Sequence, residues 1–237
     1  MDAIFIIDKP KGMTSHDVVQ KTRNLLNVKK VGHAGTLDPL ATGLLPICVG
    51  RGTKLVREIM EGEKEYEATL KLGVETASGD LGAEILREEE PPKITKEELE
   101  IALKKFRGSI IQKTPSYSAV KYKGKRLYTL ARQGKPLPEI PRQVVIYKLE
   151  AIEKHGNFIK LRIACSIGTY IRALLPDIAK ACGTCGVVTE LQRTRVGRFS
   201  LKEAAPWAAF EEGVLKKQDF TTLPGYVTPS GLKNVTL

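Results

Sequence analysis

The segment Gly32-His33-Ala34-Gly35-Thr36-Leu37-Asp38-Pro39-Leu40-Ala41-Thr42-Gly43-Leu44-Leu45 is the most informative stretch of this 237-residue chain. Its glycines, threonines and proline predict a loop, and the apolar run to Val49 that follows predicts a buried strand. His33 and Asp38 place an imidazole and a carboxylate five residues apart. Because loops held on rigid scaffolds often carry chemistry, Asp38 is a candidate active group. The spacing alone leaves open a plain turn in which this aspartate caps a helix.

The elements on either side of this loop are predicted from hydrophobic spacing and capping residues. The apolar residues 3–7 predict a buried strand. A helix is expected to begin at Thr14 or Ser15, whose hydroxyls can cap it, and to stop at Asn27. Residues 64–74 alternate between apolar and polar side chains, which is typical of a half-buried strand.

Further along the chain the same signals recur. A capping box from Thr95 to Glu98 predicts a helix that ends at Gly108. Alternation over 158–165 predicts a strand, and a helix should begin after Thr169. Pro176 lies inside that helical pattern and predicts a kink or an early end.

The connections between strands indicate the fold class. Strands over 142–152 and 157–166 are separated by residues 155–157, a loop too short for a crossover helix. The sequence therefore predicts an α+β fold whose central sheet is mixed and largely antiparallel, flanked by helices, instead of a doubly wound parallel sheet.

Charge is distributed unevenly along the chain. Thirty-eight Lys and Arg residues against 27 Asp and Glu give a net charge of +11, which favours a polyanionic partner. Residues 113–142 hold eight basic groups and a single acid, Glu139, and also contain three tyrosines, Tyr117, Tyr122 and Tyr128. Tyrosines interleaved with positive charge favour RNA binding over a merely solvated basic face.

Other classes of protein are disfavoured. No apolar run is long enough to span a bilayer, and the chain begins with an acid where a signal peptide carries positive charge, so we expect a cytoplasmic location without membrane contact. Cys182 and Cys185 have C-x-x-C spacing, but the other two cysteines lie in apolar runs, which disfavours a zinc or redox site. The stretch 50–54 lacks the full phosphate-loop pattern.

Six blocks of the sequence together resemble the bacterial tRNA pseudouridine synthase B family. The loop of residues 32–45 is similar to the family signature G-H-x-G-T-L-D-P-x-A-x-G-x-L. The other blocks follow in family order over residues 4 to about 205: Asp8-Lys9-Pro10-Lys11-Gly12-Met13-Thr14-Ser15, Lys64-Glu65-Tyr66, Tyr117-Ser118-Ala119-Val120-Lys121 with Gly124 and Tyr128, Gly168-Thr169-Tyr170-Ile171-Arg172, and Arg193-Thr194-Arg195-Val196-Gly197.

This resemblance implies a pseudouridine-synthase fold and a catalytic set of three residues. Asp38 is implied to be the nucleophile that acts on a uridine flipped out of an RNA loop, whether at the base or at the sugar. Arg172 is implied to pair with Asp38, and Tyr66 to stack on the flipped base and assist proton transfer from C5. Without the family motif, Arg172 reads as a surface helix residue and Tyr66 as a core residue.

The resemblance also implies residues that bind and support the substrate. Tyr170 and Leu191 would line the base pocket, and His33 would position RNA, with a structural histidine as the alternative. Lys9 and Pro10 would support the loop from beneath. Residues 113–142 would form an inserted RNA-binding thumb loop, to which Tyr117 and Lys121 belong.

The implied reaction is the conversion of the T-loop uridine of tRNA, position 55, to pseudouridine, with no cofactor and no metal. A second hypothesis, from another class, is a tRNA-folding chaperone, accompanying catalysis or replacing it. We expect residues 1–205 to be the catalytic domain and 206–237 a short extension, too short for the PUA RNA-binding domain that many members carry. A monomer is the default expectation.

Overall fold

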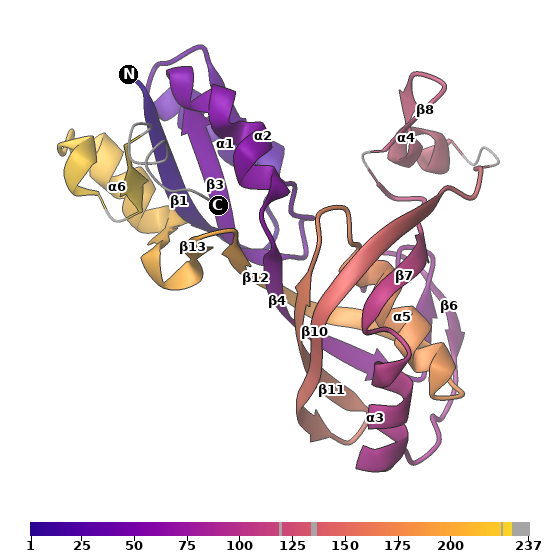
Figure 1. Ribbon diagram of the computed structural model, residues 1–237. Coiled ribbons are helices and arrows are strands. Elements are labelled where there is room, and N and C mark those ends of the chain that lie inside the picture. Colours follow the sequence, from indigo (N-terminus) through magenta and orange to yellow (C-terminus); the bar gives the residue numbers. More distant parts are fainter. Residues whose placement is uncertain (119, 134–136, 224, 229–237) are drawn as a thin grey trace. The chain divides into compact units, whose positions relative to one another are not determined.

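The computed structural model describes residues 1–118, 120–133, 137–223 and 225–228. The chain divides into two compact units (Figure 1): unit 1 comprises Met1–Tyr66 and Leu191–Leu237, and unit 2 comprises Glu67–Glu190. Ala119 and Lys135, which belong to the predicted thumb loop, lie outside the described residues. No helix in the part of the chain that is described is long and apolar enough to cross a membrane.

Unit 1 is built on a mixed sheet in the order β14-β1-β3-β12, with three short strands paired at its sides. β1 runs antiparallel to β3, while β12 runs parallel to β3 and β14 parallel to β1. The strands are β1 (Ala3–Lys9), β2 (Val31–His33), β3 (Thr42–Val49), β12 (Gly186–Val196), β13 (Phe199–Ser200), β14 (Ala205–Pro206) and β15 (Tyr226–Val227). Ala3 to Ile7 are fully buried, as the apolar run predicts.

Helices cover this sheet. The first, α1 (Ser15–Leu25), begins at a capping box between Thr14 and Asp17, which confirms the predicted start. The others are α2 (Val56–Glu61) and α6 (Trp207–Leu215), with 3₁₀ turns at Gly50–Leu55, Leu201–Glu203 and Phe220–Thr222. The predicted extension is part of this unit: α6 packs beside β1 (Figure 1), with the Phe5 and Phe210 rings 5.0 Å apart, and β15 pairs with β1.

Unit 2 has strands in the order β4-β11-β10-β7 and two separate hairpins. Its strands are β4 (Lys64–Leu72), β5 (Val74–Thr76), β6 (Ile85–Glu88), β7 (Gly108–Lys113), β8 (Lys121–Tyr122), β9 (Lys125–Arg126), β10 (Pro141–His155) and β11 (Phe158–Cys165). Alternate side chains of β4 are buried, and β10 and β11 form an antiparallel hairpin, so both predictions are confirmed. Together with the helices and with the parallel and antiparallel strand pairs of unit 1, this gives the predicted α+β fold with a mixed sheet.

The helices of unit 2 are α3 (Lys96–Lys104), α4 (Leu127–Arg132) and α5 (Ile171–Ala181). α3 starts from the predicted capping box between Thr95 and Glu98, and α3 and α5 pack together. The expectation that Pro176 could end its helix early is wrong, because α5 continues to Ala181. Its buried apolar face keeps the helix in place although Pro176 supplies no N–H to the carbonyl of Arg172.

Candidate active site

Asp38 lies half-buried in an irregular loop of unit 1, residues Ala34–Ala41, between β2 and β3. We call this segment the Asp38 loop. Its fold depends on contacts made on both sides of the aspartate. The Ser15 hydroxyl, in the first turn of α1, donates to the Leu37 carbonyl at 3.1 Å and accepts the Leu37 N–H at 2.8 Å. The Gly12 N–H donates to the Pro39 carbonyl at 2.8 Å. The backbone is therefore fixed immediately before and after the carboxylate.

Lys9, at the end of β1, is fully buried in the same unit. Its ammonium group donates to the carbonyls of Pro10 and Met13, at 2.9 and 2.6 Å. The pKa of Lys9 is lowered to about 8. Burial is the main cause and the charge of Arg193 adds to it, while the Asp38 carboxylate acts in the opposite direction. The predicted supporting residue is thus a buried cation whose field reaches the candidate nucleophile.

His33, the last residue of β2, borders the start of the Asp38 loop. Its Nδ1 is buried and has no hydrogen-bond partner among the described residues. Burial, followed by the charges of Arg193 and His16, lowers the pKa of His33. The lowered pKa favours the neutral ring, which suits a positioning group better than an acid.

Two residues of β12, Leu191 and Arg193, belong to unit 1, as do Lys9, His33 and Asp38. Leu191, predicted to line the base pocket, is 7% exposed. Arg193, which sequence reasoning recorded only as part of a family block, is almost completely buried and donates to the Leu44 and Gly35 carbonyls. Tyr66, the predicted stacking residue, is buried in β4 on the same face as Lys64 and Ala68.

Arg172 lies in unit 2, in the first turn of α5, and is 6% exposed. Its Nε is 3.4 Å from the Asp80 carboxylate. Its Nη1 donates to the Ser78 carbonyl at 2.8 Å, and its Nη2 to the Tyr117 carbonyl at 2.9 Å. Arg172 is thus a buried, oriented guanidinium, not the surface helix residue that its bare sequence context indicates.

The Ser78-Gly79-Asp80 turn is shaped to hold Arg172. A Cβ at Gly79, whose φ is +76°, would lie 2.2 Å from the Arg172 carbonyl oxygen. Asp80 is fixed in turn, because its Oδ1 accepts from the Ser78 hydroxyl at 2.7 Å and from the Gly82 N–H at 2.9 Å. The sequence analysis did not single out Asp80. The only local feature that could have pointed to it is its place beside Gly79 in a polar turn.

The remaining predicted residues of unit 2 lie around the start of α5 and in the thumb loop. Tyr170 directly precedes α5, and the side chain of the buried Gln112 holds its backbone. The Tyr170 N–H donates to Gln112 Oε1 at 2.8 Å, and Gln112 Nε2 donates to the Tyr170 carbonyl at 3.0 Å. Tyr117 is half-buried and meets Arg172 through its carbonyl. Lys121 is exposed in the β8–β9 hairpin.

That hairpin presents positive charge next to aromatic rings. Lys121, Lys123, Lys125 and Arg126 are all exposed. The Lys123 ammonium lies 5.4 Å from the centre of the Tyr122 ring, and the Arg126 guanidinium lies 5.9 Å from that of Tyr128. Exposed cations beside rings are suited to phosphates and stacked bases.

The structure thus gathers the predicted residues into two groups. In unit 1, the charge of Arg193 reaches Lys9 and His33, the charge of Asp38 reaches Lys9, and Leu191 lies on the same strand as Arg193. In unit 2, Arg172, Tyr117 and Tyr170 meet around Asp80 and Gln112. Because Asp38 and Arg172 belong to different units, their pairing stays a prediction.

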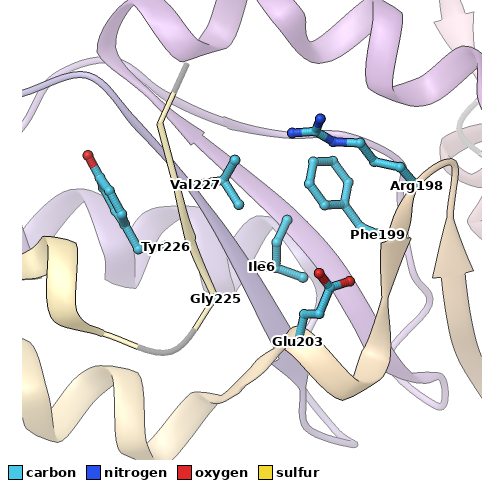
Figure 2. A pocket seen from close by; sticks show the side chains of 7 residues that line it. All are labelled: Ile6, Arg198, Phe199, Glu203, Gly225, Tyr226 and Val227. Carbon is cyan, nitrogen blue, oxygen red and sulfur yellow. The ribbon is translucent and has the colours of Figure 1, made fainter. Parts of the chain in front are cut away.

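Two other features lie apart from these groups. A cavity of about 360 Å³ in unit 1 is lined by seven residues that include none of the predicted ones (Figure 2): Ile6, Arg198, Phe199, Glu203, Gly225, Tyr226 and Val227. Cys182 and Cys185 are free thiols near the end of α5, and burial raises the pKa of both. Among the described residues, no group of three or more His, Cys, Asp or Glu could hold a metal ion.

Comparison with known proteins identifies the family. A model described as "TruB family pseudouridylate synthase (N terminal domain)" matches residues 23–171. The chain is 48% identical over 205 residues to the tRNA pseudouridine synthase B of Francisella philomiragia subsp. philomiragia, which covers 86% of this chain and 68% of that protein. The corresponding protein of Francisella tularensis subsp. tularensis is 47% identical over the same shares. The chain belongs to the TruB family.

As a TruB family member the chain is a pseudouridylate synthase, an isomerase. Solved structures confirm the fold. The Cbf5-Nop10-Gar1 complex contains a chain with a TM-score of 0.74 and 26% identity, matched over 97% of this chain and 60% of that one. The archaeal box H/ACA sRNP Nop10-Cbf5 complex contains a chain with a TM-score of 0.67 and 27% identity, matched over 90% of this chain and 53% of that one. The TruB family chain thus spans somewhat more than half of each of these structural relatives.

Proposed function

We propose that this protein converts the T-loop uridine of tRNA, position 55, to pseudouridine, with Asp38 as the nucleophile acting on a flipped-out uridine. The observation that supports this most directly is the rigidity of the Asp38 loop, whose backbone is fixed at Leu37 and at Pro39. A half-buried carboxylate on a fixed backbone is prepared for attack before substrate arrives. The names of the TruB relatives support tRNA as the substrate.

The reaction rearranges one nucleotide without an external group. The bond between N1 and C1′ breaks, the uracil rotates, and a bond forms between C5 and C1′, after which the C5 proton is lost and N1 gains a proton. Asp38 forms a covalent bond to the nucleotide during this sequence, at the base or at the sugar, and this bond breaks again before the product leaves, which restores the free carboxylate. Tyr66 stacks on the uracil and assists removal of the C5 proton, and Arg172 pairs with Asp38 when the substrate is bound.

The RNA is held by residues around these three. Tyr170 and Leu191 line the base pocket, and neutral His33 positions the RNA. Tyr117, Lys121 and the β8–β9 hairpin grip the T-stem-loop. The hairpin's exposed cations beside aromatic rings support this part of the proposal. We further propose that residues 1–205 act as the catalytic domain, as a monomer and in the cytoplasm.

The test follows tritium release from an unmodified tRNA transcript labelled at uridine C5, without added metal or nucleotide. Wild type should release tritium, and a transcript with cytidine at position 55 should release none. Asp38→Asn should abolish release and still bind tRNA in a gel shift. Glu61→Gln, which removes an exposed carboxylate from the same unit, should act like wild type. Full release by Asp38→Asn would exclude Asp38 as the nucleophile, and binding without release by wild type would favour a tRNA-folding chaperone.

A further inference from the structure

Arg193 is almost completely buried, although it carries a large charged side chain. It lies in β12, where its backbone pairs with Gly43 of β3, and its side chain is 2% exposed. Its Nε donates to the Leu44 carbonyl at 2.8 Å and its Nη2 to the Gly35 carbonyl at 3.0 Å. Gly35 is the second residue of the Asp38 loop, and Leu44 lies in β3 just after the loop. One guanidinium therefore ties both ends of the loop that carries Asp38.

The backbone is shaped around this side chain. A Cβ at Gly43 would lie 2.3 Å from the Arg193 carbonyl oxygen, and a Cβ at Gly35 would lie 3.1 Å from Nη1. The glycines at both ends of the loop thus allow Arg193 to approach closely. Substituting either glycine would push the strand or the guanidinium away from the loop.

The charge of Arg193 also reaches its neighbours. It contributes to lowering the pKa of Lys9 and of His33, next to the burial that acts first on each. A buried guanidinium costs desolvation free energy, which hydrogen bonds to two carbonyls offset. An apolar side chain would fill the same space without that cost, so the arginine points to a role beyond packing.

We propose that Arg193 is a positioning residue for the reaction, which holds the Asp38 loop closed at its base through the Gly35 and Leu44 carbonyls. This inference rests on the proposed role of Asp38. Arg193 does not touch the reacting atoms in this proposal; it acts through the loop. A planar guanidinium spans two carbonyls, whereas a lysine ammonium is a single point and holds only one end at a time.

Arg193→Lys tests this, because it keeps the charge and removes the two-point tie. The single-turnover rate of tritium release at saturating enzyme should fall about 100-fold, while the Kd for tRNA changes less than about twofold. Arg57→Lys, an exposed arginine of the same unit, should leave both unchanged. A normal rate for folded Arg193→Lys, or a loss confined to Kd, would overturn the proposal.

Amide hydrogen exchange of the free protein supplies a readout independent of catalysis. In Arg193→Lys, exchange should accelerate in residues 34–44 and stay unchanged in β1. Equal acceleration across β1 and the loop would indicate a purely structural role and overturn the proposal. If Arg193→Lys does not fold, Arg193→Gln, which removes the guanidinium and leaves a single amide donor group, tests the same tie, with the same expected exchange pattern. This measurement needs no RNA and no activity. A failure of the proposal for Arg193 can therefore be told apart from a failure of the proposed role of Asp38, which the activity of Asp38→Asn tests.

Discussion

The Arg172 guanidinium lies 3.4 Å from the Asp80 carboxylate, and the side chains of both are nine-tenths or more buried. Removing either member of a buried pair is costly, because the group that remains has already lost its water and then loses a charged neighbour as well. The orientation of Arg172 therefore depends on a residue that sequence reasoning did not single out.

Asp80→Asn should lower the free energy of unfolding by about 2 kcal/mol, because it removes a buried carboxylate that faces the Arg172 guanidinium. The rate of tritium release should fall as the guanidinium loses one of its fixed contacts. Urea unfolding measures the first effect and single-turnover kinetics the second. Glu150→Gln, which breaks an exposed pair with Lys148, should cost less than about 1 kcal/mol. Equal stability of both variants would mean that the Ser78 and Tyr117 carbonyls suffice to hold Arg172.

Gly79→Ala should destabilise the protein more than Gly183→Ala. Both glycines have positive φ, at +76° and +80°, so an alanine at either is strained. Only at Gly79 does the new Cβ collide with a backbone atom, the Arg172 carbonyl oxygen, while at Gly183 it meets nothing within 4 Å. The difference in unfolding free energy should be about 2 kcal/mol. Comparable losses would show that the turn moves freely away from Arg172.

Lys9 should make stability depend on pH between about 8 and 10.5. Its pKa is lowered from 10.5 to about 8 in the folded protein, so the unfolded chain binds more protons in this window. The free energy of unfolding therefore rises with pH between about 8 and 10.5. Below pH 8 Lys9 is charged in both states, and burying that charge lowers the stability by its full amount. Relative to Lys9→Met, wild type should gain stability as pH rises from 8 to 10. Parallel pH profiles for the two proteins in urea titrations would contradict this.

The β8–β9 hairpin should supply phosphate contacts. Lys121→Gln with Lys125→Gln should weaken tRNA binding and reduce the slope of log Kd against log salt by about 1 per lysine. Fluorescence anisotropy at several salt concentrations measures this slope. The control pair is Lys148→Gln with Lys216→Gln, exposed lysines elsewhere on the chain. A slope equal to that of the control pair would exclude the hairpin from phosphate binding.

Local patterns predicted most elements because their causes are local. The capping boxes at Thr14 and Thr95 and the alternation in β4 each act within a few residues. Arg193 and Asp80 could not be found in this way, because their partners are set by the tertiary fold; Arg193 and Leu44 are 149 residues apart. The early helix end expected at Pro176 is wrong for the same reason, since packing of the α5 face outweighs one missing backbone donor.

The Ser15 hydroxyl and the Arg193 guanidinium both fix the Asp38 loop, but they are available at different times during synthesis. Ser15 precedes Leu37 by 22 residues, whereas Arg193 follows Gly35 by 158. At roughly 5 to 20 residues per second, the ribosome adds those later residues over on the order of 10 s. Until β12 emerges, the nascent chain thus carries an aspartate loop that Ser15 and Gly12 hold but Arg193 does not yet tie, so the loop acquires its last contacts late in translation.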